Sequence, residues 1–97
     1  MQVKRTVEAD NDLTELYIWG FQNYGEQQSD SYFDELEQRF QFIADQPFVV
    51  PETAGIDPPV RVSRHKAHLI IYRLEPENIT ILRVVHNRSN WRMLLGA

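Results

Sequence analysis

The chain has 97 residues, enough for one domain around one hydrophobic core. It is 42% hydrophobic and 25% charged, as folded proteins are, and the absence of cysteine excludes disulfides, thiol catalysis and cysteine-based zinc sites. Residues 1–48 hold three Lys or Arg and ten Asp or Glu, whereas residues 49–97 hold seven and four. This asymmetry predicts different partners for the two halves. It disfavours general nucleic-acid coating, which needs a clearly basic domain.

The N-terminus lacks the apolar segment of a signal peptide, and no apolar run approaches the roughly 18 residues that a membrane span needs. We therefore expect a single cytoplasmic domain, residues 1–97, with no membrane partner.

The chain begins with a predicted strand and helix. Residues Gln2–Val7 alternate weakly between polar and apolar side chains, which indicates a short strand. The polar run at residues 10–12 supplies N-cap candidates, and Asp12 with Glu15 can form a capping box. Gly25 is a natural stop for this helix.

A second helix is predicted over residues 27–45 and ends before Pro47, which cannot continue a helix. Its apolar stripe consists of Tyr32, Leu36, Phe40 and Ile43, widened by Phe33 and Phe42. The two helices form an acidic hairpin. Most of its aromatic side chains are expected in the core, and a few are expected to line a groove for a partner.

The second half predicts three strands. Residues 47–59 hold four of the five prolines and form a connector, which precedes a strand at residues 60–64. The runs His68–Leu74 and Ile79–His86 indicate a β-hairpin with a polar link at Glu75–Asn78. One helical turn follows at Asn90–Leu95, with Asn90 as its cap. The predicted class is α+β, in the order β-α-α-β-β-β.

Basic and imidazole groups are concentrated on this hairpin and its flanks, where they either bind an anionic partner or cut one. The unperturbed pKa of histidine suits proton transfer, which makes His86 a candidate acid or base, and arginine suits phosphate binding. An RNA-cleaving site would use His86 with Arg61, Arg64 and Arg83, although the sequence does not show that they converge. The three histidines lack metal-site spacing, so we expect no metal and no cofactor.

Other residues of the hairpin have simpler interpretations. His68 opens an apolar strand and is interpreted as a structural histidine bonded to a neighbouring backbone group. Arg73 is interpreted as a partly buried cation paired with Glu75 or a helix acid. Arg88 and Trp91 belong to the residue types that dominate protein interfaces, although Trp91 alternatively covers the end of the core.

The order and spacing of several fragments resemble one protein family. The fragments are Ala9-x-x-Asp12-Leu13-x-x-Leu16-x-x-Trp19, Tyr24-Gly25, Tyr32-x-x-x-Leu36-x-x-x-Phe40-x-x-Ile43-Ala44-x-x-Pro47, Arg61, His68-x-Ile70-x-Tyr72-Arg73 and Ile79-x-Ile81-Leu82-Arg83-Val84-Val85-His86-x-Arg88. Together they are similar to the ParE toxins of the RelE/ParE superfamily of type II toxin–antitoxin systems. The resemblance implies a helical hairpin packed on a small twisted antiparallel sheet.

It also implies a toxin that inhibits DNA gyrase by binding and is neutralised by a ParD-like antitoxin in a hetero-oligomer. Contact with DNA would come only indirectly, through the antitoxin. RelE-like members are instead ribosome-dependent mRNA endoribonucleases, for which a tyrosine is expected where this chain has Trp91. Indole cannot transfer a proton at neutral pH, so the substitution favours binding, with no catalytic residues. A toxin-like chain that has lost activity is a third alternative.

The resemblance and the charge pattern together give two sets of expected contacts. The target-binding set is Arg83, His86, Arg88 and Trp91. The antitoxin-binding set is Leu16, Trp19, Tyr24, Tyr32, Phe42 and Arg61.

Overall fold

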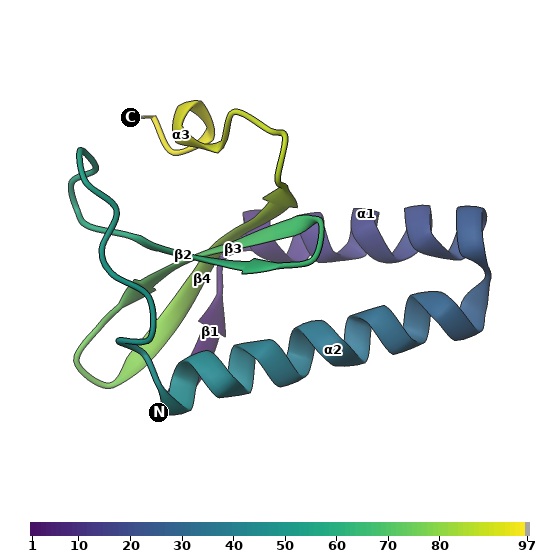
Figure 1. The fold of residues 1–97 in the computed structure, drawn as a ribbon, viewed down its shortest axis with the longest axis horizontal. Coiled ribbons are helices and arrows are strands. Elements are labelled where there is room, and N and C mark those ends of the chain that lie inside the picture. Colours follow the sequence, from purple (N-terminus) through teal and green to yellow (C-terminus); the bar gives the residue numbers. More distant parts are fainter. Residues whose placement is uncertain (97) are drawn as a thin grey trace.

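The computed structural model describes residues 1–96 and contains three helices and four strands within them. The elements are β1 (Gln2–Arg5), α1 (Val7–Tyr24), α2 (Glu26–Asp45), β2 (Arg61–His65), β3 (His68–Leu74), β4 (Asn78–His86) and α3 (Trp91–Leu94). Figure 1 shows α1 and α2 as a long hairpin beside the sheet, with the 46–60 connector and α3 away from that hairpin. The α+β class and the predicted order of elements are confirmed, with α3 as the predicted terminal turn.

The sheet has the strand order β1-β4-β3-β2. Strands β2, β3 and β4 are antiparallel neighbours, but β1 lies parallel to β4, with Gln2 opposite Asn78. The sheet is therefore mixed, not wholly antiparallel as expected. β3 occupies one edge of β4, and β1 takes the other edge. At that edge Thr6 continues the pairing through its backbone N–H to the Ile81 carbonyl, at 3.1 Å.

Hydrophobic side chains fill both faces of the sheet. Successive side chains of a strand point to opposite faces. On β3, Ile70 and Tyr72 therefore pack against the helices while Ile71 packs on the other face. The helix-facing core comprises Ala9, Leu13, Leu36, Phe40, Ile43, Ala44, Ile70, Tyr72, Ile79, Ile81 and Val84. The second core is smaller and comprises Val60, Ile71 and Val85, covered by the connector and the C-terminal segment.

Helix α1 begins earlier than predicted. Thr6 is its N-cap, and the Thr6 hydroxyl oxygen accepts from the Ala9 backbone N–H at 3.0 Å. The predicted cap at residues 10–12 and the Asp12–Glu15 capping box are therefore wrong. Asp12 lies inside the helix, where its Oδ2 accepts from the Val84 backbone N–H at 3.0 Å. This N–H lies beyond the end of β1 and needs an acceptor, so Asp12 takes the place of a strand neighbour.

The hairpin also differs in detail from the prediction. Its link is Glu75–Glu77, because β4 already begins at Asn78. Glu75 accepts from the Thr80 hydroxyl and does not pair with Arg73. Within residues 1–96, the buried Nε of Arg73 has no hydrogen-bond partner, so the predicted Arg73 ion pair is wrong. At the C-terminus, Asn90 is the N-cap of α3 without a side-chain cap bond.

Among residues 1–96, no helix is long and apolar enough to cross a membrane.

Candidate functional site

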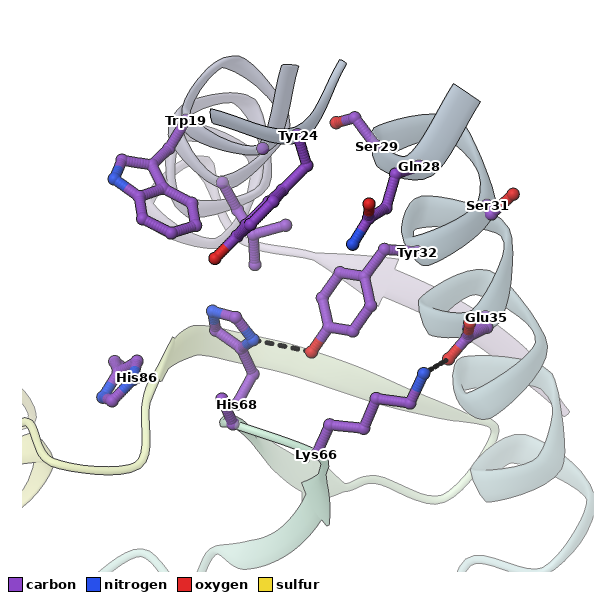
Figure 2. A pocket seen from close by; sticks show the side chains of 13 residues that line it. Trp19, Tyr24, Gln28, Ser29, Ser31, Tyr32, Glu35, Lys66, His68 and His86 are labelled. Atoms are coloured by element: carbon purple, nitrogen blue, oxygen red, sulfur yellow. Dashed lines mark hydrogen bonds and ion pairs between the residues drawn. The ribbon is translucent and has the colours of Figure 1, made fainter. Parts of the chain in front are cut away.

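A pocket of about 600 Å³ lies between the helical hairpin and the ends of β3 and β4. Its lining residues are Leu16, Trp19, Gly20, Tyr24, Gln28, Ser29, Ser31, Tyr32, Glu35, Lys66, Ala67, His68 and His86. Figure 2 shows Trp19 and Tyr24 on one side of this space and His68 and His86 on the other. The pocket thus combines an aromatic wall from α1 with a basic wall from the sheet.

The helical side of the pocket is fixed by a close approach of α1 and α2. A Cβ atom on Gly20 would lie 3.0 Å from the Ser29 hydroxyl oxygen, so only glycine fits there without a shift. Ser29 is buried, and its hydroxyl donates to the Tyr17 carbonyl at 2.9 Å. Gly25 turns the chain between the helices at a φ of 89°. This end of the hairpin therefore supplies a fixed wall.

Two aromatic side chains of that wall are exposed. The exposed fractions of Trp19 and Tyr24 are 57% and 58%. Their ring centroids lie 5.5 Å apart at an interplanar angle of 71°, an edge-to-face pair. Leu13 of the same helix is buried in the core, whereas Tyr24 lines the pocket. Large aromatic groups left in water at a concave site are typical of a binding surface.

The sheet side presents two histidines that face each other across paired strands. His68 opens β3 directly opposite His86, the last residue of β4, and the ring centroids are 5.8 Å apart. The hydroxyl of Tyr32 lies 2.7 Å from Nδ1 of His68. The predicted bond from His68 to a backbone group is therefore replaced by a bond to a side chain of α2.

Burial determines the charge state of Tyr32 and His68. It lowers the pKa of His68, and the neighbouring imidazoles of His86 and His65 lower it further. Burial also raises the pKa of Tyr32 to about 12, with a contribution from Glu35, so the phenol stays protonated at neutral pH. The Tyr32–His68 pair is thus neutral at pH 7.

Glu35 pairs with Lys66, a cationic residue of the pocket lining. Its Oε1 lies 2.7 Å from Nζ of Lys66 and 3.0 Å from Nε2 of His65. Hydrogen bonds from Lys66 and His65 lower the pKa of Glu35, so this carboxylate is ionised at neutral pH. Within residues 1–96, no three His, Asp or Glu side chains are placed to hold a metal ion together.

The structure brings together four of the six residues predicted to contact an antitoxin. Leu16, Trp19, Tyr24 and Tyr32 all line the pocket. Phe42 and Arg61 do not. Phe42 lies near the C-terminus of α2, where the guanidinium of Arg39 covers its ring at 5.0 Å. Arg61 donates to the Val50 carbonyl at 2.6 Å and pairs with Glu52. The apolar stripe runs along α2, so the stripe alone did not indicate that Tyr32 lines the pocket and Phe42 does not.

The predicted target-binding residues are dispersed. His86 lines the pocket, and Arg88 is exposed two residues beyond it. Arg83 forms two bonds to Asp12, at 2.7 and 2.9 Å, and these hydrogen bonds raise the pKa of the guanidinium. Trp91 is half-buried against the second core. Only His86 and Arg88 of this set are neighbours with accessible side chains.

The alternative catalytic residues are also separated. Arg61 and Arg64 lie on opposite faces of β2, three residues apart. Arg64 donates to the Lys66 carbonyl, and Arg83 is held by Asp12. His68 and Lys66 line the pocket with His86, and neither was among the predicted site residues. Pairing of the two predicted hairpin strands places His68 opposite His86, and this pairing could have indicated His68 as a site residue.

Comparisons with known proteins agree with this fold. The family described as "ParE toxin of type II toxin-antitoxin system, parDE" matches residues 3–91. The chain is 27% identical over 88 residues to Toxin ParE1 of Caulobacter vibrioides, covering 91% of each chain. A solved structure described as the "Chromosomal ParDE TA system from P. aeruginosa" superposes with a TM-score of 0.75 at 17% identity. That superposition covers 89% of this chain and 95% of the other, and it shows a shared fold.

Proposed function

The chain belongs to the ParE toxin family of type II toxin–antitoxin systems, and we propose that it inhibits DNA gyrase by binding and is neutralised by a ParD-like antitoxin. It would act in the cytoplasm, in a hetero-oligomer with the antitoxin, and would reach operator DNA only through that partner.

The observation that carries the antitoxin part is the pocket. Trp19 and Tyr24 are more than half exposed there, beside Leu16 and Tyr32. Covering such aromatic groups removes apolar area from water, worth about 25 cal/mol per Å². Tryptophan and tyrosine are also the residue types that most often dominate binding energies. An antitoxin segment seated in this pocket supplies the missing cover.

The gyrase part of the proposal rests on family membership and on the segment that follows β4. Arg88 is exposed, and its backbone N–H donates to Nδ1 of His86 at 3.1 Å. This bond couples the position of Arg88 to the rim of the pocket. An antitoxin bound in the pocket would therefore cover His86 and approach Arg88, so one partner would block the other by overlap.

Binding is favoured over RNA cleavage because the alternative catalytic groups are held apart. Phosphoryl transfer needs an acid, a base and phosphate-stabilising cations at one reacting centre. The guanidinium of Arg83 is paired with Asp12 of α1, and that of Arg61 is bound by the connector, so neither of them lines the pocket with His86. Trp91 packs on the second core and offers no proton-transfer group.

The test uses the purified chain with purified gyrase and relaxed plasmid. We expect loss of supercoiling and accumulation of gyrase-linked DNA breaks, both reversed by the antitoxin encoded beside the gene. The same preparation is added to a translating extract, where we expect intact mRNA. Unchanged supercoiling together with ribosome-dependent mRNA cleavage would overturn the proposal in favour of the endoribonuclease.

A further inference from the structure

Helix α2 meets the edge strand β2 through polar side chains that lie close to one another. Ser63 of β2 lies opposite Ile70 of the helix-facing core, and residues directly opposite each other share a face of the sheet. Arg61 is two residues from Ser63 on the same strand, so both side chains point toward the helices. From α2, the Nε of Arg39 donates to the buried Ser63 hydroxyl at 3.1 Å. The side chains of Arg39 and Arg61 are therefore neighbours along this edge of the sheet.

The two arginines have one carboxylate partner between them. The Arg61 side chain is 11% exposed, and its Nη2 lies 3.5 Å from Oε1 of Glu52. Within residues 1–96, Arg39 forms no ion pair. Glu35 lies one turn before Arg39 on α2, but Lys66 already engages its carboxylate. An excess of one positive charge therefore remains at this edge, beside a nearly buried guanidinium.

The free hydrogen-bond donors at this edge belong to Arg39. Its bond to Ser63 uses Nε, and within residues 1–96 its Nη1 and Nη2 groups have no hydrogen-bond partner. Neither group is fully buried, so both are open to solvent. Burial raises the pKa of Tyr72, and Arg61 and Arg39 act in the opposite direction, which agrees with two cations near the same phenol. Nη1 and Nη2 form a planar pair of donors that matches the two oxygens of a carboxylate.

Exposed phenyl rings flank both cations. The guanidinium of Arg39 lies 5.0 Å from the ring centroid of Phe42, which is 41% exposed. The guanidinium of Arg61 lies 5.2 Å from the ring centroid of Phe48, which is 73% exposed. A cation over an aromatic face is attracted by the ring, so each contact orients both groups. Arginine and aromatic side chains are the types enriched at protein interfaces.

The backbone that carries Phe48 is fixed on both sides. Phe48 belongs to the connector that leaves the C-terminal end of α2 (Figure 1). The Tyr72 hydroxyl donates to the Pro47 carbonyl at 3.0 Å, and Nη1 of Arg61 donates to the Val50 carbonyl at 2.6 Å. The exposed ring is thus presented from an ordered segment, which reduces the entropy lost when a partner covers it.

We propose that Arg39, Phe42, Arg61 and Phe48 form a second antitoxin-binding surface, which takes an Asp or Glu side chain next to a bulky apolar residue. The carboxylate pairs with Nη1 and Nη2 of Arg39 and compensates the excess charge, and the apolar residue covers the ring of Phe48. A nucleic-acid backbone fits less well, because its other phosphates would meet the half of the chain that holds ten Asp or Glu. The inference rests on the proposed function only for the identity of the partner.

This surface is separate from the pocket but lies on the same helix. It contains Phe42 and Arg61, the two predicted antitoxin contacts that do not line the pocket. Arg39 follows Tyr32, a pocket residue, by two helical turns, which is about 10 Å along α2. An extended chain covers this distance in about three residues and a helix in about seven. One short antitoxin segment can therefore occupy both places.

The first test removes the free cation. Arg39→Gln should weaken binding of the purified antitoxin encoded beside the gene at least about tenfold, measured by calorimetry. Arg5→Gln is the matched control: it makes the same change in net charge, but Arg5 already pairs with Asp10 and Glu37. We expect it to weaken binding by less than about twofold. Equal losses would show an effect of net charge alone and overturn the proposal.

The second test removes the exposed ring and does not depend on the Arg39–Ser63 bond. Phe48→Ala should weaken antitoxin binding at least about fivefold while leaving urea unfolding unchanged, because the ring is mostly in water. Val7→Ala is the control, since Val7 is an equally exposed apolar side chain at the start of α1. If Arg39→Gln lowers only the stability and Phe48→Ala changes nothing, Arg39 merely joins α2 to β2 and the proposal is wrong.

The last test identifies the carboxylate. Each Asp and Glu in the C-terminal segment of the antitoxin is replaced by Asn or Gln. One replacement should weaken binding to the unmodified toxin at least about tenfold and have no further effect on Arg39→Gln. Additive losses at every position would refute the shared contact. Gyrase inhibition by the toxin alone reports the proposed function separately, and Arg39→Gln and Phe48→Ala should both retain it.

Discussion

The two tryptophans of this chain have different environments. Trp19 is 57% exposed at the pocket, with Tyr24 against its edge. Trp91 is half-buried against the second core, and the guanidinium of Arg92 covers its ring at 4.9 Å. Both were candidates for partner contacts by residue type. Accessibility separates the two side chains: Trp19 is available to a partner, whereas Trp91 attaches the C-terminal segment to the sheet.

The pocket and the segment after β4 are nevertheless joined at one place. His86 belongs to the pocket, and the amide of Arg88 bonds to its ring. The proposed antitoxin surface and the proposed gyrase surface therefore meet at the end of β4. Changes that move β4 should affect both regions, and changes in side chains on either side of His86 should separate them.

The largest expected effect comes from removing the contact that holds β4 to α1. Asp12→Ala leaves Arg83 and the Val84 N–H without their acceptor, both partly buried. We expect the free energy of unfolding to fall by about 3 kcal/mol, because leaving such groups unpaired costs more than the bond itself contributes. Urea unfolding measures this loss.

The control for Asp12 is Asp10→Ala on the same helix. Asp10 pairs with Arg5 at 2.8 Å, and the two side chains are 55% and 38% exposed, far more than those of the Asp12–Arg83 pair. Its removal should change the unfolding free energy by less than about 0.5 kcal/mol. Similar losses for the two variants would show that Asp12 does not fix β4.

The next effect compares the tryptophans directly. Trp91→Ala should lower the free energy of unfolding by about 2 kcal/mol, since a half-buried ring is lost from the second core. Trp19→Ala should change it by less than about 0.5 kcal/mol, because the ring is mostly in water. Urea unfolding of both variants tests the comparison. A larger loss for Trp19 would reverse the roles given to the two regions.

The smallest expected effect is a pH dependence from the pocket. Burial lowers the pKa of His68 in the folded state, so the unfolded state binds its proton more readily. Stability from neutral His68 is present above the unfolded pKa near 6.5 and declines as the pH falls below it. Between pH 7.5 and 5.5, stability should fall more steeply in the unmodified protein than in His68→Phe. Equal slopes in urea unfolding would contradict the assigned environment.

Periodic features of the fold were predictable from the sequence, and single long-range contacts were not. The hairpin strands follow from apolar runs bounded by polar links, and the helices follow from their apolar spacing. Thr6 and Asp12 are both good N-cap residues, so local chemistry could not choose between them. The choice was made by the Val84 N–H, 72 residues from Asp12 in the chain.

The composition of the pocket was predictable only in part for the same reason. Of the residues predicted by type, Trp19, Tyr24 and Tyr32 line the pocket, but Phe42 shares the apolar stripe of Tyr32 and lies near the other end of α2. The partners of His68 depend on the register of β3 with β4 and on the approach of α2, which no local pattern specifies. At Arg73 a local contact was predicted that does not form. Glu75 lies two residues away and was expected to pair with Arg73, but it accepts from the Thr80 hydroxyl instead.

One measurement tests the separation of the two regions most directly. It is the inhibition of gyrase supercoiling by the unmodified toxin, by Trp19→Ala and by Arg88→Ala, each titrated with antitoxin. We predict that Trp19→Ala inhibits gyrase as the unmodified toxin does but needs at least about tenfold more antitoxin for neutralisation. Arg88→Ala should lose inhibition while still binding the antitoxin. Full inhibition by Arg88→Ala, or neutralisation of Trp19→Ala by the same amount of antitoxin as the unmodified toxin, would contradict the account.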